Sequence, residues 1–156
     1  MKIRELLQKN SVLIDLPAAD KKEAVSRLAG HMASMYNLPD SALIARKVLE
    51  REAQVSTGIG FGIAVPHARV EKINRMYMAA ARNSKGIDFS SIDGQPVHLI
   101  FMIISPTGAS NEHVQILSSL SRIMSYEDIR KKLMAAKSPE KFLELLIKGE
   151  NKYVEQ

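Results

Sequence analysis

Ser56–Arg69 reads STGIGFGIAVPHAR, and this stretch combines three kinds of backbone signal. Its first half holds three glycines separated by single residues, Gly58, Gly60 and Gly62. Glycine reaches backbone angles closed to other residues and lets another backbone approach closely. The apolar run Ile63–Val65 then predicts a short strand, which Pro66 ends because proline cannot donate to a sheet ladder. We therefore expect a tight loop, a strand, and the imidazole of His67 held at the end of that strand.

Length and composition limit the class of protein. The 156 residues predict one domain spanning residues 1–156, large enough to bury about 70% of its unfolded surface. Cysteine is absent, which excludes disulfides, thiolate metal sites and thiol catalysis. No apolar run approaches the roughly 20 residues that span a bilayer, and residues 1–16 make a poor signal peptide. We expect a cytoplasmic protein without membrane insertion.

The chain carries a net charge of +5, which fits either a solvated basic surface or a nucleic-acid-binding surface. Lysines and arginines are spread along the chain rather than packed into a tract. Aromatic residues are few, and no basic–aromatic interleaving suggests base stacking. The pattern favours a solvated surface that binds no nucleic acid, and attraction to an acidic protein remains open.

The segment before the glycines predicts one strand and two helices. Weak alternation over Ser11–Leu16 indicates the strand. The first helix has an apolar face at helical spacing and breaks at Asn37–Pro39. The second runs to about Gln54, so Arg51 lies in its last turn, where a cation suits the helix dipole. The candidate N-caps are Asp20 for the first helix and Asp40 or Ser41 for the second.

The segment after His67 predicts two further strands. Arg75–Ser84 indicates the first, and the turn-rich segment Asn83–Pro96 predicts a loop or wide hairpin. Val97–Ile104 is almost continuously apolar, as in a central strand covered on both faces. A second loop then covers residues 107–110.

Three helices are predicted after these strands. The first bears His113, with Asn111 as a plausible N-cap, and the second covers Tyr126–Ala136. The third is capped by Ser138 with Pro139 in its first turn, and a frayed polar tail is expected after Gly149. Helices before, between and after the strands indicate the α/β class, with a single mixed β-sheet flanked by helices on both faces.

Three side chains are candidates for chemistry. His67 ends one strand, and His113 opens a helix after the longest apolar strand. Ligands of open α/β sheets bind outside the carboxyl ends of the strands, so the two rings would share one cleft if both ends meet there. The Arg51 guanidinium suits an oxyanion such as phosphate. His31 and His98 are interpreted as structural instead.

Other chemical templates fit poorly. The glycine spacing differs from that of a dinucleotide-binding fingerprint, and no phosphate-binding P-loop sequence follows. No HExxH motif is present, and no ligand spacing supports zinc held by two histidines and Glu52 or Glu112. Ser56 and Thr57 are candidate donors to an anion, although small loop hydroxyls commonly form turns. The residues alone favour two histidines and an arginine arranged for phosphoryl chemistry.

These residues also carry a family resemblance. The block from Arg51–Glu52 through Ser56–Gly60 to Gly62–His67 resembles the active-site signature of enzyme IIA domains. The type is the mannitol/fructose class of the bacterial phosphoenolpyruvate-dependent phosphotransferase system, which includes nitrogen-regulatory IIA proteins. The resemblance covers nearly the whole chain, including the opening segment and Val97–Pro106 followed by His113–Leu117.

The resemblance implies a phosphohistidine relay without cofactor or metal. The phosphocarrier HPr would donate a phosphoryl group to His67, and His113 and Arg51 match the second histidine and the arginine of the family. Phe61 stands where many relatives carry a polar residue, often asparagine, and Ala68 stands where many carry glycine. Phe61 therefore puts the identity of donor and acceptor in question.

Three readings of the function follow. A regulatory, nitrogen-type IIA would use phosphorylation to control its binding to target proteins, and the opening segment favours this reading. A sugar-specific, fructose/mannitol-type IIA would pass the phosphoryl group to a IIB domain for sugar uptake. A metal-dependent hydrolase using His67 and His113 is the third reading and would need bound zinc.

Overall fold

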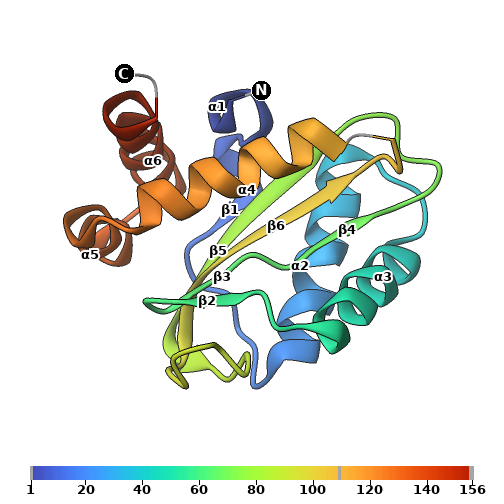
Figure 1. The fold of residues 1–156 in the computed structure, drawn as a ribbon, viewed down its shortest axis with the longest axis horizontal. Coiled ribbons are helices and arrows are strands. Elements are labelled where there is room, and N and C mark those ends of the chain that lie inside the picture. Colours follow the sequence, from blue (N-terminus) through green and yellow to red (C-terminus); the bar gives the residue numbers. More distant parts are fainter. Residues whose placement is uncertain (1, 109, 155–156) are drawn as a thin grey trace.

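A mixed six-stranded sheet lies between two groups of helices in the computed structural model, which describes residues 2–108 and 110–154 (Figure 1). The α/β class and the helix-covered mixed sheet predicted from the sequence are confirmed. The helices are α1 (Ile3–Leu6), α2 (Lys21–Tyr36), α3 (Ser41–Gln54), α4 (Ser110–Met124), α5 (Glu127–Ala135) and α6 (Pro139–Tyr153), with a 3-10 turn at Lys9–Ser11. The strands are β1 (Val12–Leu13), β2 (Gly58–Gly60), β3 (Ile63–Ala64), β4 (His67–Arg69), β5 (Tyr77–Ile87) and β6 (Val97–Ser105).

The long strand β6 organises the sheet. The strand order is β1-β5-β6-β3-β2, and β4 also pairs with β6. β6 is antiparallel to β5 and parallel to β3 and β4. The carboxyl ends of β4 and β6 therefore lie at the same end of the sheet, as the sequence analysis requires for a shared cleft.

Alternate residues of β6 enter two separate hydrophobic cores. Ile100, Met102 and Ile104 pack with one core, and Leu99, Phe101 and Ile103 pack with the other. The exposed fraction of each of these six side chains is 1% or less, so the strand is covered on both faces as predicted. Full burial of such a side chain contributes roughly 1.5–3 kcal/mol relative to exposure.

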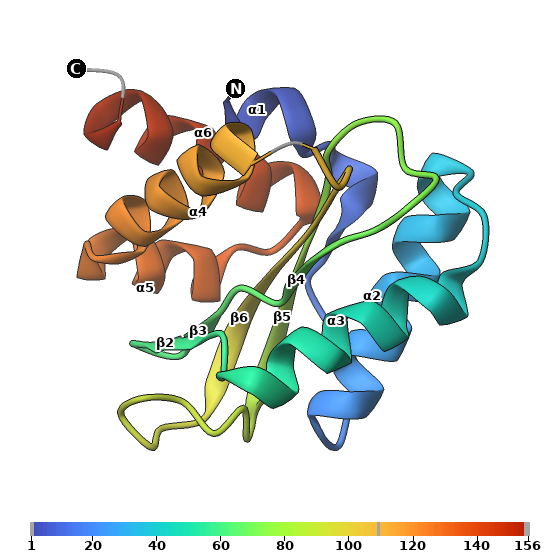
Figure 2. The same cartoon turned by 45° about the vertical axis from the view of Figure 1, so that its right-hand side comes forward.

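The two helical layers divide along the same faces (Figure 2). α2 and α3 pack with the first core, and α1, α4, α5 and α6 pack with the second. The predicted caps are confirmed: Asp20 accepts from the Glu23 amide, Asp40 from the Leu43 amide, and Ser138 from the Lys141 amide. No helix among the described residues is long and apolar enough to cross a membrane.

The strand that carries His67 is interrupted rather than ended. β3 and β4 both run along β6, and between them the Pro66 carbonyl accepts from the Ile103 amide at 3.1 Å. The prediction that His67 lies at a strand end is therefore corrected, because His67 begins β4. The break follows from Pro66, which has no N–H to continue the ladder.

The glycine segment is also more regular than expected. Gly58–Gly60 forms β2, which pairs antiparallel with β3, so the tight loop is reduced to the turn around Phe61 and Gly62. Phe61 has a φ of 60°, a left-handed conformation that favours glycine or asparagine. Its amide donates to Asp93 at 3.1 Å, and the Arg130 guanidinium lies 4.4 Å from its ring centroid.

Four further sequence predictions need correction. The first strand covers only Val12–Leu13, and β5 extends to Ile87 rather than ending at residue 84. α4 begins at Ser110, so Asn111 lies inside the helix and does not precede it. The tail after Gly149 is not frayed up to Tyr153, because Glu150 is 1% exposed and accepts from the Ile3 amide at 2.5 Å.

Candidate functional site

His67 is held by one backbone hydrogen bond. Its Nδ1 lies 2.8 Å from the Val65 carbonyl oxygen, and the side chain is half-buried. A carbonyl oxygen only accepts, so Nδ1 carries the ring proton. The Val65 carbonyl is available because the ladder is interrupted at this point. The lone pair of the neutral ring is thereby left on Nε2.

His113 lies beside His67. It is in the first turn of α4 and is 3% exposed, and its Nδ1 is 2.5 Å from Ser105 Oγ. Ser105 ends β6 and pairs in register with Arg69, two residues after His67. The two imidazole centroids are 4.9 Å apart with an interplanar angle of 64°. The structure thus brings together the two histidines that the sequence placed at the carboxyl ends of two strands.

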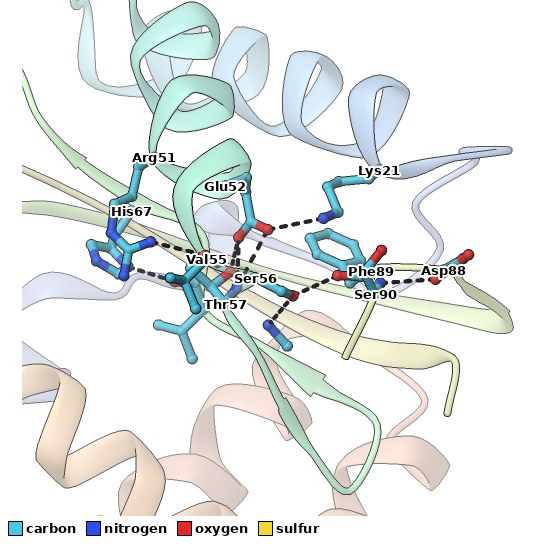
Figure 3. A network of polar contacts seen from close by, with 12 residues as sticks. Lys21, Arg51, Glu52, Val55, Ser56, Thr57, His67, Asp88, Phe89 and Ser90 are labelled. Atoms are coloured by element: carbon cyan, nitrogen blue, oxygen red, sulfur yellow. Dashed lines mark hydrogen bonds and ion pairs between the residues drawn. The ribbon is translucent and has the colours of Figure 1, made fainter. Parts of the chain in front are cut away.

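Arg51 borders the same site from α3. Its Nη1 donates to the Val55 carbonyl at 2.9 Å, which anchors the guanidinium at the end of the helix next to His67 (Figure 3). Arg51, His67 and His113 line one open pocket of about 190 Å³. The other lining residues are Lys47, Glu50, Gln54, Ala68 and Arg69. Three cationic side chains therefore surround the two rings, with one carboxylate among them.

Both histidines are neutral near pH 7 in this setting. Burial lowers the pKa of His67, and Arg51 and Arg69 add to the fall, while the Val65 hydrogen bond and the negative charge of Glu52 oppose it. Burial lowers the pKa of His113 to about 4, assisted by His67, Arg69 and Arg51. A neutral ring offers a nucleophilic lone pair at one nitrogen and a donor at the other.

A buried polar network extends from the end of α3, next to Arg51 and His67, toward Lys21 on α2 (Figure 3). The Glu52 carboxylate is 5% exposed, accepts from the Thr57 amide at 3.1 Å and from the Thr57 hydroxyl, and pairs with Lys21 Nζ at 3.1 Å. Ser56 Oγ donates to the Phe89 carbonyl at 2.5 Å and accepts from the Gly58 amide. Both loop hydroxyls that sequence reasoning offered to an anion therefore bond within the protein.

Sequence reasoning did not assign the structural roles of three residues at this site, Glu52, Arg69 and Ser105, although it considered Glu52 as a zinc ligand. Arg69 and Ser105 stand next to the predicted histidine segments, but neither position signals its partner across the sheet. Glu52 is adjacent to Arg51 and five residues before Thr57, and only its burial reveals its role. His31 and His98 bond to the carbonyls of Asn10 and Asn83, as structural histidines do.

Metal ligation is the other chemistry that two neighbouring histidines allow. A hydrolytic zinc needs three protein ligands with an open position. Within residues 2–108 and 110–154, no group of three or more His, Cys, Asp or Glu side chains is arranged to hold a metal ion. The chemistry that the arrangement does offer is a nucleophilic ring nitrogen, a second imidazole as hydrogen-bond donor, and cations that stabilise an anionic group.

Residues 5–149 match one protein family, described as the phosphoenolpyruvate-dependent sugar phosphotransferase system, EIIA 2. The fructose-specific EIIABC component of Bacillus subtilis is 37% identical over 94% of the chain, which spans 23% of that relative's length. The fructose-specific EIIA component of Haloferax volcanii is 36% identical over 86% of the chain and 88% of its own length.

Two comparisons point to a different group within the family. A nitrogen regulatory protein of Bradyrhizobium diazoefficiens is 33% identical over 94% of the chain and 95% of its own length. The crystal structure of the nitrogen regulatory protein IIA-Ntr from Neisseria meningitidis superposes with a TM-score of 0.87 at 30% identity. That match covers 92% of the chain and 98% of the Neisseria chain.

Proposed function

We propose that His67 Nε2 is the atom that carries the phosphoryl group of this chain, which belongs to the family described as the phosphoenolpyruvate-dependent sugar phosphotransferase system, EIIA 2, and is a phosphotransfer component. The observation that carries this assignment is the Nδ1 hydrogen bond to Val65 at 2.8 Å. It fixes the proton on Nδ1 and leaves Nε2 as the nucleophile in a pocket lined by Arg51, Arg69 and His113.

Transfer of the phosphoryl group to neutral His67 requires no proton to be added or removed. The Nε2 lone pair of neutral His67 attacks the phosphorus of the phosphorylated donor, and a bond from nitrogen to phosphorus forms. The bond from phosphorus to its carrier atom on the donor breaks, and that atom keeps the electron pair. Positive charge develops on the His67 ring, and the Val65 carbonyl stabilises it through the Nδ1 proton. Such transfers depend mainly on placement and on stabilised phosphoryl oxygens.

His113 and Arg51 are assigned to those phosphoryl oxygens. When the Ser105 hydroxyl donates to Nδ1 of His113, the proton of the neutral ring lies on Nε2, which then donates to the phosphoryl group. Arg51 supplies positive charge and is prepositioned by Val55. Arg69 adds positive charge from β4. Donors fixed before the reaction stabilise developing charge without reorganisation.

The partners are proposed from the family and its named members. HPr is the donor, and the acceptor is either a regulatory target or a IIB domain. The TM-score of 0.87 with IIA-Ntr supports the regulatory reading, which we favour. The identities of 37% and 36% to fructose-specific components support the alternative of a sugar-specific IIA. A cytoplasmic location stays a prediction.

Two experiments test these assignments. The purified chain is incubated with phosphoenolpyruvate, enzyme I and HPr, and phosphorylation is followed by intact mass. The wild type should gain one phosphoryl group and His67→Ala none, and uptake by His67→Ala would refute the assignment. The charged protein is then offered to fructose-type and mannitol-type IIB domains. Fast discharge to one of them would favour the sugar-specific reading over the regulatory one.

A further inference from the structure

We propose that Glu52 is a positioning residue for His67, acting through Thr57 and Val65 to fix the imidazole in the tautomer that presents Nε2. The inference rests on the proposed function of His67. Glu52 does not line the pocket and touches no reacting atom. Its effect would pass through a series of hydrogen bonds from Glu52 by way of Thr57 and Val65 to His67. Figure 3 shows the start of this series, where Glu52 contacts Thr57 and Lys21.

The first step joins Glu52 to the glycine segment. One carboxylate receives both the amide and the hydroxyl of Thr57, the residue directly before β2. Glu52 is on α3 and Thr57 is beyond the end of that helix, so this contact fixes how the chain leaves α3. A buried carboxylate needs such partners, because an unpaired buried charge is strongly unfavourable.

The second step joins Thr57 to the ring. The Thr57 carbonyl accepts from the Val65 amide at 3.0 Å, and the Val65 carbonyl accepts from His67 Nδ1 at 2.8 Å. Val65 is thus held at its amide by the segment that Glu52 anchors, and at its carbonyl it orients the imidazole. A shift of Thr57 would displace the backbone of Val65 through its amide, and would move the Val65 carbonyl away from Nδ1.

Lys21 explains why a charged carboxylate is needed. Its ammonium is 3.1 Å from Glu52 Oε2, and it links α2 to the network. A glutamine at position 52 has one oxygen and one NH₂ group. If its oxygen accepts from Thr57, its NH₂ group faces the Lys21 ammonium. If its oxygen accepts from Lys21, its NH₂ group faces the Thr57 donors. Either choice leaves one buried contact unmade.

The test compares Glu52→Gln with Glu144→Gln. Glu144 is an exposed carboxylate on α6 that also pairs with lysines, Lys141 and Lys148, far from the site in sequence and fold. Quench-flow transfer from phosphorylated HPr should be about 10-fold slower in Glu52→Gln, since small misplacements of reacting groups are costly. The slowing should appear at saturating donor. Glu144→Gln should transfer at the wild-type rate.

The ring itself provides a readout that a merely structural role would not move. Long-range ¹H–¹⁵N spectra of the full chain distinguish His67 protonated at Nδ1 from His67 protonated at Nε2. The wild type should show the Nδ1–H form, and Glu52→Gln should show a mixture of the two forms. A wild-type ring protonated at Nε2 would overturn the inference even if the Glu52 variant failed to fold.

Two milder variants at Thr57 test the same series of contacts if Glu52→Gln does not fold. Thr57→Val removes the hydroxyl contact but keeps the amide contact, so transfer should slow about 3-fold, and Thr57→Ser should restore it. If His67→Ala remains unphosphorylated while Glu52→Gln and Thr57→Val both match the wild type in rate and tautomer, the positioning role fails and the proposed function stands. If His67→Ala is phosphorylated, the proposed function itself fails.

Discussion

At the scale of single residues, the proposed transfer depends on keeping two neighbouring imidazoles neutral. The ring centroids of His67 and His113 are 4.9 Å apart, and Arg51 and Arg69 lower the pKa of both side chains further. Protonating one ring would place a cation against the other, so the neutral pair is favoured. The same cations that disfavour protonation would stabilise a phosphoryl dianion. Under the proposed function, the pocket would therefore disfavour an added proton and favour an added phosphoryl group, because the two carry charges of opposite sign.

Removing the second imidazole should slow transfer without abolishing it. In His113→Ala the proposed hydrogen-bond donor to the phosphoryl oxygens is lost, while Nε2 of His67 remains a nucleophile. Loss of one preorganised donor commonly costs about 10²–10³-fold in rate. Quench-flow with phosphorylated HPr should therefore show a slower rate of about 10²-fold, with phosphorylation still on His67. A rate equal to that of the wild type would remove His113 from the mechanism.

His113 should also make the stability of the protein depend on pH. Its folded-state pKa of about 4 lies below the unfolded value of 6.5, so the unfolded chain binds the proton more tightly. The contribution of His113 to the free energy of unfolding is fully present above pH 6.5 and is lost as pH falls from 6.5 toward about 4. The loss approaches about 3 kcal/mol, at 1.36 kcal/mol for each pKa unit.

Urea unfolding at pH 7 and pH 5 measures this contribution. The free energy of unfolding of the wild type should fall between the two conditions, and that of His113→Gln should fall less because the titrating ring is absent. His67 has a pKa lowered in the same direction and remains in both proteins, so the difference between the two slopes isolates His113. Parallel slopes would contradict the assignment.

At the scale of elements, glycines that look alike in the sequence differ in what surrounds them. A Cβ on Gly58 would lie 2.2 Å from Ser91 Oγ and 3.0 Å from Ser91 Cα, so the alanine cannot fit without displacing backbone. Gly30 lies inside α2 with no heavy atom within 4 Å of the added Cβ. The surroundings of each glycine therefore decide whether its replacement by alanine stabilises or destabilises the protein.

Gly58→Ala should lower the free energy of unfolding by about 1–3 kcal/mol, the usual cost of overpacking. Gly30→Ala should raise it by about 0.5–1 kcal/mol, because alanine loses less backbone entropy in a helix. Urea unfolding of the two variants and the wild type measures both changes. Changes of the same sign in both proteins would show that the close approach of β2 to Ser91 does not govern this segment.

The elements that sequence reasoning predicted well are those with local causes. The apolar run of β6 and the caps Asp20, Asp40 and Ser138 are visible within a few residues, and all were confirmed. β2 was missed because a Gly-Ile-Gly strand has no strand propensity and exists only by pairing with β3. The end of α6 was misjudged because Glu150 is buried by a contact 147 residues away. The roles of Glu52 and Ser105 depend on burial and partners in the same way.

At the scale of the whole molecule, β6 joins the two cores and the site. Its alternate residues fill both helical layers, and its last residue, Ser105, contacts His113. The site therefore lies where helices of both layers, α3 and α4, meet the end of one central strand. A change in the packing of either layer against β6 would shift one wall of the pocket relative to the other.

The two ends of the chain are joined by one buried carboxylate, which gives a test of how far local contacts govern global stability. Glu150 on α6 accepts from the Ile3 amide at 2.5 Å and from Arg4 Nε at 3.3 Å, and so caps α1. Glu150→Gln keeps the volume but loses the charge, so the free energy of unfolding should fall by about 2 kcal/mol, the size of a hydrogen bond to a charged group.

Glu144→Gln, six residues earlier on the same helix, removes an exposed carboxylate and should leave the urea midpoint unchanged. Because α6 packs in the core that also holds α4, the loss should appear as one cooperative transition of the whole protein, with faster hydrogen exchange at the Ile3 amide. Equal midpoints for the two variants would mean that the Glu150 contacts add nothing to the stability that the other contacts of α1 supply.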